Sequence, residues 1–125
     1  MLLGREVREL AALPAAAREL AATFRTAVLV KGGHLADETC ADVLCTADGV
    51  IHSFVAPRIA TAASHGTGCT LAAAITARLA CGDDLPQAIT AAKDYLGRCL
   101  RQAYAFPGPL HALNQGTTAA RPKTG

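Results

Sequence analysis

Apolar residues recur at two different intervals along the chain, and this pattern predicts alternating helices and strands. Between residues 13 and 24 they return every three or four positions, which is typical of one buried face of a helix. Residues 27–30 form a continuous apolar run instead, which indicates a strand buried on both faces, as in a parallel sheet covered by helices. A helix that leads into such a strand is half of a βαβ unit and favours an α/β fold.

Two short strands are predicted next, over residues 41–46 and 50–55. The Asp48-Gly49 pair between them is a typical hairpin signal, because tight turns of this kind need residues that accept positive φ angles. We therefore expect the two segments to pair as an antiparallel hairpin, followed by a loop over residues 56–64.

The second half of the chain predicts two helices. The first begins near Gly68 and ends near Cys81, and its surface is so rich in alanine and larger apolar side chains that we expect it to be almost fully buried. The second runs from about residue 85 to residue 104, and Asp84 and Gln87 have the spacing of a capping box at its start. Asp84 and its acidic neighbour are therefore assigned to helix capping rather than to metal binding or acid–base chemistry.

The composition describes one folded domain. Hydrophobic residues make up 51% of the chain and charged residues only 18%, which excludes a disordered protein. The net charge is +2, acids and bases are interspersed and aromatic residues make up 4%, so nothing indicates a nucleic-acid partner. Residues 114–125 are polar and rich in Gly and Thr, so we expect a domain over residues 1–113 and a disordered tail after it.

The five cysteines follow neither a CxxC nor a zinc-binding spacing, and their number is odd. We therefore expect reduced thiols and no metal site formed by cysteine. No apolar run is long enough to span a membrane, and the first residues lack the charged region and apolar core of a signal peptide. The expected location is the cytoplasm, with no membrane partner.

The segment Gly66-Thr67-Gly68-Cys69 is the main candidate for chemistry. Its glycines let backbone N–H groups turn towards a common point, and the start of the following helix has unpaired N–H groups that favour an anion. Cys69 lies in the first turn of that helix, where a thiolate is favoured. The spacing matches neither a P-loop nor a dinucleotide-binding fingerprint. The segment is thus either an anion hole beside an activatable thiol or a tight loop that packs closely against a strand.

Lys31-Gly32-Gly33-His34 is the second candidate, at the end of the predicted buried strand. Ligands gather at the carboxyl ends of strands in open α/β sheets, and a lysine there can reach a phosphate as a point charge. The alternative is a solvated lysine beside a turn histidine. Lys93, on the long second helix, is solvated by default.

The chain resembles the C-terminal half of the hydroxymethylpyrimidine/phosphomethylpyrimidine kinases, the thiamine-pathway members of the ribokinase-like superfamily. The resemblance covers about residues 2–111 and depends on three stretches: residues 31–34, residues 65–70 with the sequence HGTGCT, and Ala92-Lys93-Asp94-Tyr95. It implies a three-layer ribokinase-like α/β fold. This chain would be a C-terminal partial domain with a mostly parallel sheet, a hairpin and flanking helices.

The resemblance also implies an activity, namely ATP-dependent phosphorylation of hydroxymethylpyrimidine and of its monophosphate, with Mg²⁺, to supply thiamine diphosphate synthesis. By the family pattern, residues 66–69 are the anion hole for the transferring phosphoryl group and Cys69 is the catalytic base. Lys31 lies at a position associated with the ATP phosphates, and Lys93 lies near the base of the nucleotide.

Members of this family are considerably longer than the present chain, and Met1 falls where they are already inside the domain. The half with the first strands, the pyrimidine pocket and the acidic residues that help hold Mg²⁺ has no counterpart here. We expect a truncated, late-started or split gene product with no substantial kinase activity alone, which acts as a homodimer or with a missing N-terminal half. The alternatives are a non-catalytic nucleotide- or anion-binding remnant and a related pyridoxal-type kinase.

Overall fold

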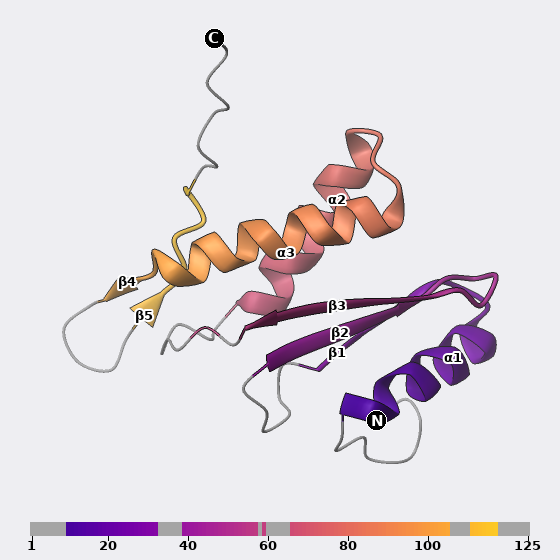
Figure 1. The fold of residues 1–125 in the computed structure, drawn as a ribbon. Helices are drawn as coiled ribbons and strands as arrows, with labels where there is room; N and C mark the ends of the chain where they lie inside the picture. Colours follow the sequence, from indigo (N-terminus) through magenta and orange to yellow (C-terminus); the bar gives the residue numbers. More distant parts are fainter. Residues whose placement is uncertain (1–9, 33–38, 58, 60–65, 106–110, 118–125) are drawn as a thin grey trace, which may run out of the picture. The chain divides into compact units, whose positions relative to one another are not determined.

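The structure is a computed structural model that describes residues 10–32, 39–57, 59, 66–105 and 111–117 (Figure 1). The chain divides into two compact units, Met1–Arg58 and Ile59–Gly125. Among the helices that the structure describes, none combines the length and the apolar character needed to cross a bilayer.

The first unit is a three-stranded sheet with one helix packed on it (Figure 1). Its elements are the 3₁₀ turn η1 (Leu10–Ala12), the helix α1 (Leu13–Phe24) and the strands β1 (Val28–Lys31), β2 (Thr39–Cys45) and β3 (Ile51–Pro57). The predicted helix over residues 13–24 is confirmed, and its apolar face forms the core. Leu13, Ala17 and Ala21 of α1 pack there with Val43 and Cys45 of β2.

The strand order is β1-β2-β3, and both pairings are antiparallel. The predicted parallel sheet is therefore wrong for the described strands, and β1 is half-buried rather than buried on both faces. Only residues 32–38 connect β1 to β2, whereas a parallel crossover needs a dozen residues or more. The apolar run in β1 arises because its side chains pack against α1. It contains no information on whether the neighbouring strand is parallel or antiparallel.

The predicted hairpin between β2 and β3 is confirmed, with Cys45 opposite Ile51 at its closed end. Gly49 has a φ of +89°, in the left-handed region that glycine enters at little cost. The backbone N–H groups of Gly49 and Val50 donate to the carbonyl and to the hydroxyl oxygen of Thr46, at 2.9 Å and 3.0 Å. The turn is thus closed by local hydrogen bonds, which is why local sequence was sufficient to predict it.

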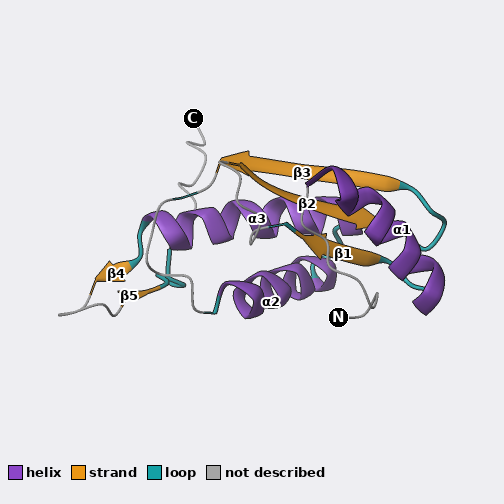
Figure 2. Cartoon of the chain, turned by 90° about the horizontal axis from the view of Figure 1, so that it is seen from below, coloured by secondary structure: helices purple, strands orange, loops and turns teal. Residues whose placement is uncertain are grey.

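The second unit contains two helices that pack on each other, α2 (Thr67–Ala80) and α3 (Leu85–Arg101). It also contains the short antiparallel strands β4 (Tyr104–Ala105) and β5 (His111–Ala112), which lie beside the C-terminal end of α3 (Figure 2). These strands were not predicted. The second predicted helix ends three residues early because the chain enters β4, whose partner strand lies further along the sequence.

The alanine-rich helix α2 is mostly exposed, so the expectation of near-complete burial is wrong. Only Thr70 and Leu71 are buried in it, Ala74 is half-buried and Leu79 is 42% exposed. Helix α3 covers one side of α2. Alanine content indicates that a helix can be covered on several sides, but it does not supply the elements that would cover it.

Helix α3 begins with the capping box predicted from its sequence. The Asp84 carboxylate accepts a hydrogen bond from the Gln87 backbone N–H at 2.9 Å, and the Gln87 side chain accepts one from the Asp84 N–H at 3.2 Å. Pro86 lies in the first turn, where its missing N–H loses no helical hydrogen bond. The acidic neighbour Asp83 pairs with Arg78 at 2.6 Å. Both carboxylates therefore have structural partners.

We expect Asp84→Ala to lower the free energy of unfolding by about 1 kcal/mol, because it leaves a helix N–H group without its acceptor. Asp84→Asn keeps a side-chain oxygen at this position and should stay close to the parent protein. Urea denaturation followed by circular dichroism measures both values. Equal stability of the two variants would contradict the role of the cap.

Residues 114–117 form hydrogen bonds with α2 and α3. The Asn114 N–H donates to the Cys99 carbonyl at 3.2 Å, and the Gln115 side-chain amide donates to the Thr70 hydroxyl at 2.8 Å. The hydroxyl of the buried Thr117 donates to the side-chain oxygen of Gln102, the C-cap of α3, at 2.7 Å. For these four residues the expectation of a disordered tail is wrong, and residues 118–125 lie outside the described residues. The domain boundary at 113/114 stays a prediction.

Candidate functional site

The first turn of α2 presents backbone donors that have no partner within the helix, as its sequence predicted. Gly66 is the N-cap of the helix, with a φ of +82°. The first intrahelical hydrogen bond runs from the Thr70 N–H to the Gly66 carbonyl at 2.9 Å, so the N–H groups of Thr67, Gly68 and Cys69 have no acceptor within the helix. Gly66 has no side chain to cap them. Three donors and the positive end of the helix dipole therefore meet at one turn, which favours an anion.

Cys69 is exposed in this same turn and has a free thiol. Its sulfur lies in the first turn of α2, at the positive end of the helix dipole. The other four cysteines are also free thiols. A free thiol and a group of N–H donors without partners in the helix thus share one exposed turn.

The residues that follow this turn are fixed in the packed part of the second unit. Thr70 and Leu71 are 6% and 2% exposed, and the Thr70 hydroxyl accepts the hydrogen bond from the Gln115 side chain. The exposed glycine–cysteine turn therefore continues directly into a buried anchor. Such an arrangement holds the donors in place without a ligand, which is what preorganised charge stabilisation requires. The contact of Gln115 with Thr70 was not predicted, because Gln115 lies in a polar segment whose sequence has no helical or strand periodicity.

Lys31 lies at the end of β1, as predicted, and its side chain is exposed. The next residue, Gly32, is buried, and its N–H donates to a carboxylate oxygen of Asp42 at 3.0 Å. Asp42 is 5% exposed and lies opposite Lys31 in the register of β2. This buried carboxylate fixes the exit of the chain from β1. Sequence reasoning missed it, although an acidic residue inside an apolar strand was a visible signal.

The predicted site residues are divided between the two units of the structure. Lys31 belongs to the first unit, whereas the glycine–cysteine turn and Lys93 belong to the second. Lys93 is half-buried on α3. Gly33, His34 and His65 lie outside the described residues. The local part of the site, residues 66–69, is therefore the part with a defined geometry.

Within the described part of the chain, no three His, Cys, Asp or Glu side chains gather as ligands for a metal ion. Mg²⁺ prefers octahedral oxygen coordination, usually with one or two protein carboxylates and the phosphates of a substrate. The acidic residues described above have other partners, such as Gly32 for Asp42 and Arg78 for Asp83. The described residues do not form a magnesium site by themselves.

Comparison with known proteins gives a consistent family. The family model described as phosphomethylpyrimidine kinase matches residues 1–112. The hydroxymethylpyrimidine/phosphomethylpyrimidine kinase of Mycobacterium leprae is 40% identical over 125 aligned residues, which cover 94% of this chain and 44% of that protein. The kinase of the same name from Rhizobium meliloti is 44% identical over 107 residues, which cover 79% of this chain and 40% of that protein.

The fold has a counterpart among solved structures. The ADP complex of Bacillus subtilis pyridoxal kinase matches 90% of this chain with a TM-score of 0.79 and 27% sequence identity. The match covers 42% of that kinase. This likeness confirms the predicted ribokinase-like α/β fold class. The chain thus spans between 40% and 44% of the length of these three proteins.

Proposed function

Because the chain belongs to the phosphomethylpyrimidine kinase family, we propose that it supplies the phosphoryl-transfer part of an ATP-dependent kinase that acts on hydroxymethylpyrimidine and its monophosphate in thiamine diphosphate synthesis. The observation that carries this proposal is the first turn of α2, where a left-handed Gly66 exposes backbone donors beside the thiol of Cys69. The chain spans less than half of its relatives, so activity requires the part of the domain that it does not span.

In the proposed reaction, the γ-phosphoryl group of ATP binds at the N–H groups of residues 67–69. These donors stabilise the negative charge on its oxygens during transfer, without having to reorganise. The Cys69 thiolate accepts the proton of the substrate hydroxyl while that oxygen forms its bond to phosphorus. The bond between phosphorus and the bridging oxygen of ATP breaks at the same time, and ADP leaves. The exposure of Cys69 lets a substrate hydroxyl reach its sulfur.

We assign the nucleotide to the same site. Lys31 would contact the phosphates through its ammonium group, and its exposure leaves that group accessible. Lys93 would lie near the nucleotide base. The ADP complex of the Bacillus subtilis pyridoxal kinase supports nucleotide use in this fold. The ligands for Mg²⁺, which would neutralise charge on the phosphates, would come mainly from the rest of the domain.

A pyridoxal-type kinase is the second candidate, because a pyridoxal kinase is the structural counterpart. The relatives with 40% and 44% identity carry the pyrimidine-kinase name instead, and their sequence similarity is much higher. We therefore favour the pyrimidine substrate. A non-catalytic nucleotide-binding module is the third candidate, and it differs from the others by binding ATP without turnover.

The test is a chimera in which this chain replaces the matching portion of the Mycobacterium leprae kinase. We expect ATP-dependent ADP production with hydroxymethylpyrimidine and its monophosphate, with less product from pyridoxal, and background activity from the isolated chain. The parent kinase is the positive control. A folded chimera that binds ATP without turnover would establish the binding module instead. Robust turnover by the isolated chain would contradict the requirement for the rest of the domain.

A further inference from the structure

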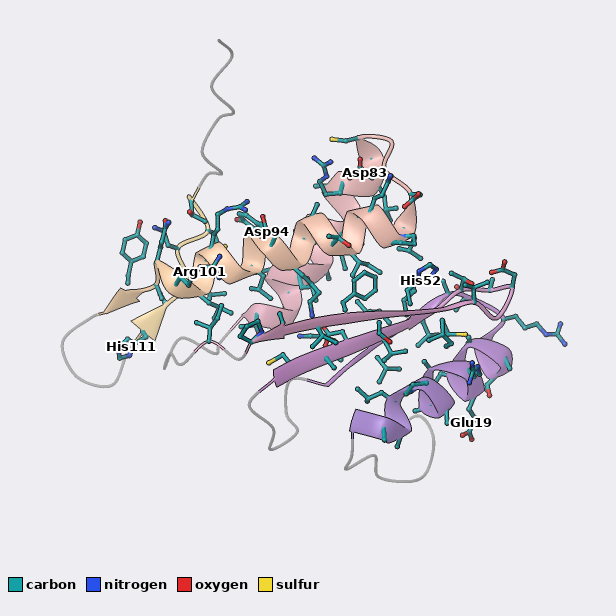
Figure 3. All side chains as sticks on the ribbon, viewed as in Figure 1. Glu19, His52, Asp83, Asp94, Arg101 and His111 are labelled. Atoms are coloured by element: carbon teal, nitrogen blue, oxygen red, sulfur yellow. The ribbon has the colours of Figure 1, made fainter. Side chains whose placement is uncertain are left out.

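Residues 114–117 form a short segment, the strap, that joins the first turn of α2 to α3 within the second unit. The strap follows β5, whose first residue, His111, is labelled in Figure 3. The phosphomethylpyrimidine kinase family model matches residues 1–112 and therefore ends before the strap. The family match consequently assigns no role to these four residues.

Gln115 of the strap forms hydrogen bonds with both helices. Its side-chain amide donates to the Thr70 hydroxyl on α2 at 2.8 Å, and its backbone carbonyl accepts from the Tyr95 hydroxyl on α3 at 2.6 Å. Desolvation, and after it a hydrogen bond with Cys99, raises the pKa of the Tyr95 hydroxyl, which therefore remains a donor at neutral pH. The backbone of Gln115 is thus held by α3, while its side chain holds α2.

Other residues of the strap are anchored at the C-terminal end of α3. The Asn114 N–H donates to the carbonyl of the buried Cys99 at 3.2 Å. Thr117 is 9% exposed, and its hydroxyl donates to the Gln102 side chain at 2.7 Å. These bonds lie before and after Gln115 in the sequence, so the side chain of Gln115 extends from a fixed backbone towards α2.

The glycine–cysteine turn requires a support other than a capping side chain. A cap would accept hydrogen bonds from the first N–H groups of the helix, which are the donors that an anion uses. Gly66, the N-cap, makes no such bond. Helix ends fray, and fraying here would scatter the donors. A hydrogen bond to Thr70, the residue directly after the donors, restrains the turn without using the N–H groups of residues 67–69.

Thr70 can transmit this restraint to the whole turn. It is 6% exposed, and its backbone N–H donates to the Gly66 carbonyl at 2.9 Å, so the three donor residues lie between two fixed ends. Without the Gln115 amide, the buried hydroxyl of Thr70 would lose its donor, and a buried polar group without a partner is unfavourable. The turn would then shift so that this hydroxyl reaches water.

We propose that Gln115 is a positioning residue for phosphoryl transfer, which acts through Thr70 to hold the N–H groups of residues 67–69 in the orientation that binds the transferring group. The strap supplies the rigidity that a cap would otherwise give, and it leaves the donors available to the ligand. Gln115 itself touches neither the nucleotide nor the substrate in this role. The inference rests on the proposed function, in which this turn stabilises the phosphoryl oxygens.

The first test measures kcat in the chimeric kinase. Gln115→Met keeps the length of the side chain and removes its amide, whereas Thr117→Val removes a hydrogen bond of the strap at the end of α3. We expect Gln115→Met to lower kcat by about ten- to a hundredfold, because small displacements of catalytic groups are costly, with little change in KM for hydroxymethylpyrimidine. Thr117→Val should lose at least as much stability, because Thr117 is buried and Gln115 is exposed, but it should keep its kcat.

A double-mutant cycle shows whether Gln115 acts through Thr70. Thr70→Val keeps the shape of the side chain and removes its hydroxyl. Because both substitutions break the same hydrogen bond, the variant that combines them should be no slower than the slower single variant.

A second readout does not require kinase activity. Iodoacetate is an anion and iodoacetamide is neutral, so the ratio of their alkylation rates at Cys69 of the full chain, measured by peptide mass spectrometry, reports how strongly the turn attracts an anion. Cys81, an exposed thiol at the other end of α2, is the internal reference. We expect Gln115→Met to lower the ratio at Cys69 by about two- to fivefold and to leave the ratio at Cys81 unchanged.

Three results would each overturn the proposal: the same kcat in Gln115→Met and Thr117→Val, losses that multiply in the double-mutant cycle, and an unchanged alkylation ratio at Cys69. The two readouts also separate this inference from the proposed function. A chimera without turnover, together with a lowered ratio in Gln115→Met, supports the hold of Gln115 on the turn and contradicts the kinase. An active chimera in which Gln115→Met changes neither readout supports the kinase and contradicts the positioning role.

Discussion

Replacing Cys69 by Ala is expected to lower ADP production by the chimeric kinase by about 10²- to 10⁴-fold, the usual contribution of a positioned general base. The thiol is exposed in the first turn of α2, beside the N–H groups that would hold the transferring phosphoryl group. Without its sulfur, no described side chain of this turn other than the Thr67 hydroxyl is available to accept the proton of the substrate hydroxyl. Single-turnover assays with saturating ATP measure the loss in the chemical step.

The loss should occur without a loss of stability. Cys69 is exposed, so its replacement by Ala should change the free energy of unfolding by less than about 0.5 kcal/mol. Cys81 provides a matched control, because it is also an exposed free thiol and lies at the other end of α2. Cys81→Ala should leave turnover unchanged. Near-normal turnover in Cys69→Ala would show that the Cys69 sulfur is not the general base.

Features determined by neighbouring residues were predictable from the sequence. The capping box at Asp84 and the hairpin turn at Gly49 are closed by hydrogen bonds that span only three or four residues. The same is true of the turn at Gly66, where the Thr70 N–H begins the helix. Local spacing therefore specified these elements before any tertiary contact was considered.

Features that depend on distant partners were not predictable in the same way. The apolar run in β1 was consistent with a parallel or an antiparallel neighbour, and its antiparallel pairing with β2 depends on the short connection between the two strands. Residues 114–117 are polar, yet Gln115 bonds to Thr70 across 45 positions of the sequence. The exposure of α2 likewise depends on which elements are available to cover it. Composition contains none of this information.

The same distinction between local and distant contacts applies to the candidate site. The glycine–cysteine turn was predicted because all of its members are consecutive in the sequence. Asp42, which holds the backbone after Lys31, lies on another strand and was missed. The relation between Lys31 and Cys69 depends on how two units pack, and consecutive sequence does not encode it. The assignment of both residues to one nucleotide site therefore remains a proposal that the chimera tests.

Replacing Gly66 by Ala is the second prediction with a large expected effect. The backbone of Gly66 has a φ of +82°, and a Cβ atom there would meet no atom within 4 Å. The substitution therefore acts through the backbone alone, which costs about 1–2 kcal/mol in the left-handed conformation or rotates the peptide away from it. Rotation would turn the N–H groups of residues 67–69 away from their common point. The loss of one such donor lowers kcat by about 10²- to 10³-fold.

Gly49→Ala is the matched control for this substitution. Gly49 has a φ of +89° and also has no atom within 4 Å of a built Cβ, but it lies in the β2–β3 turn of the first unit. Both variants should lose similar stability in urea denaturation of the chimera, whereas only Gly66→Ala should lose kcat. Equal losses of turnover would attribute the effect to stability. Full turnover in Gly66→Ala would show that phosphoryl transfer does not use the donors at the start of α2, because those donors depend on the left-handed conformation of this residue.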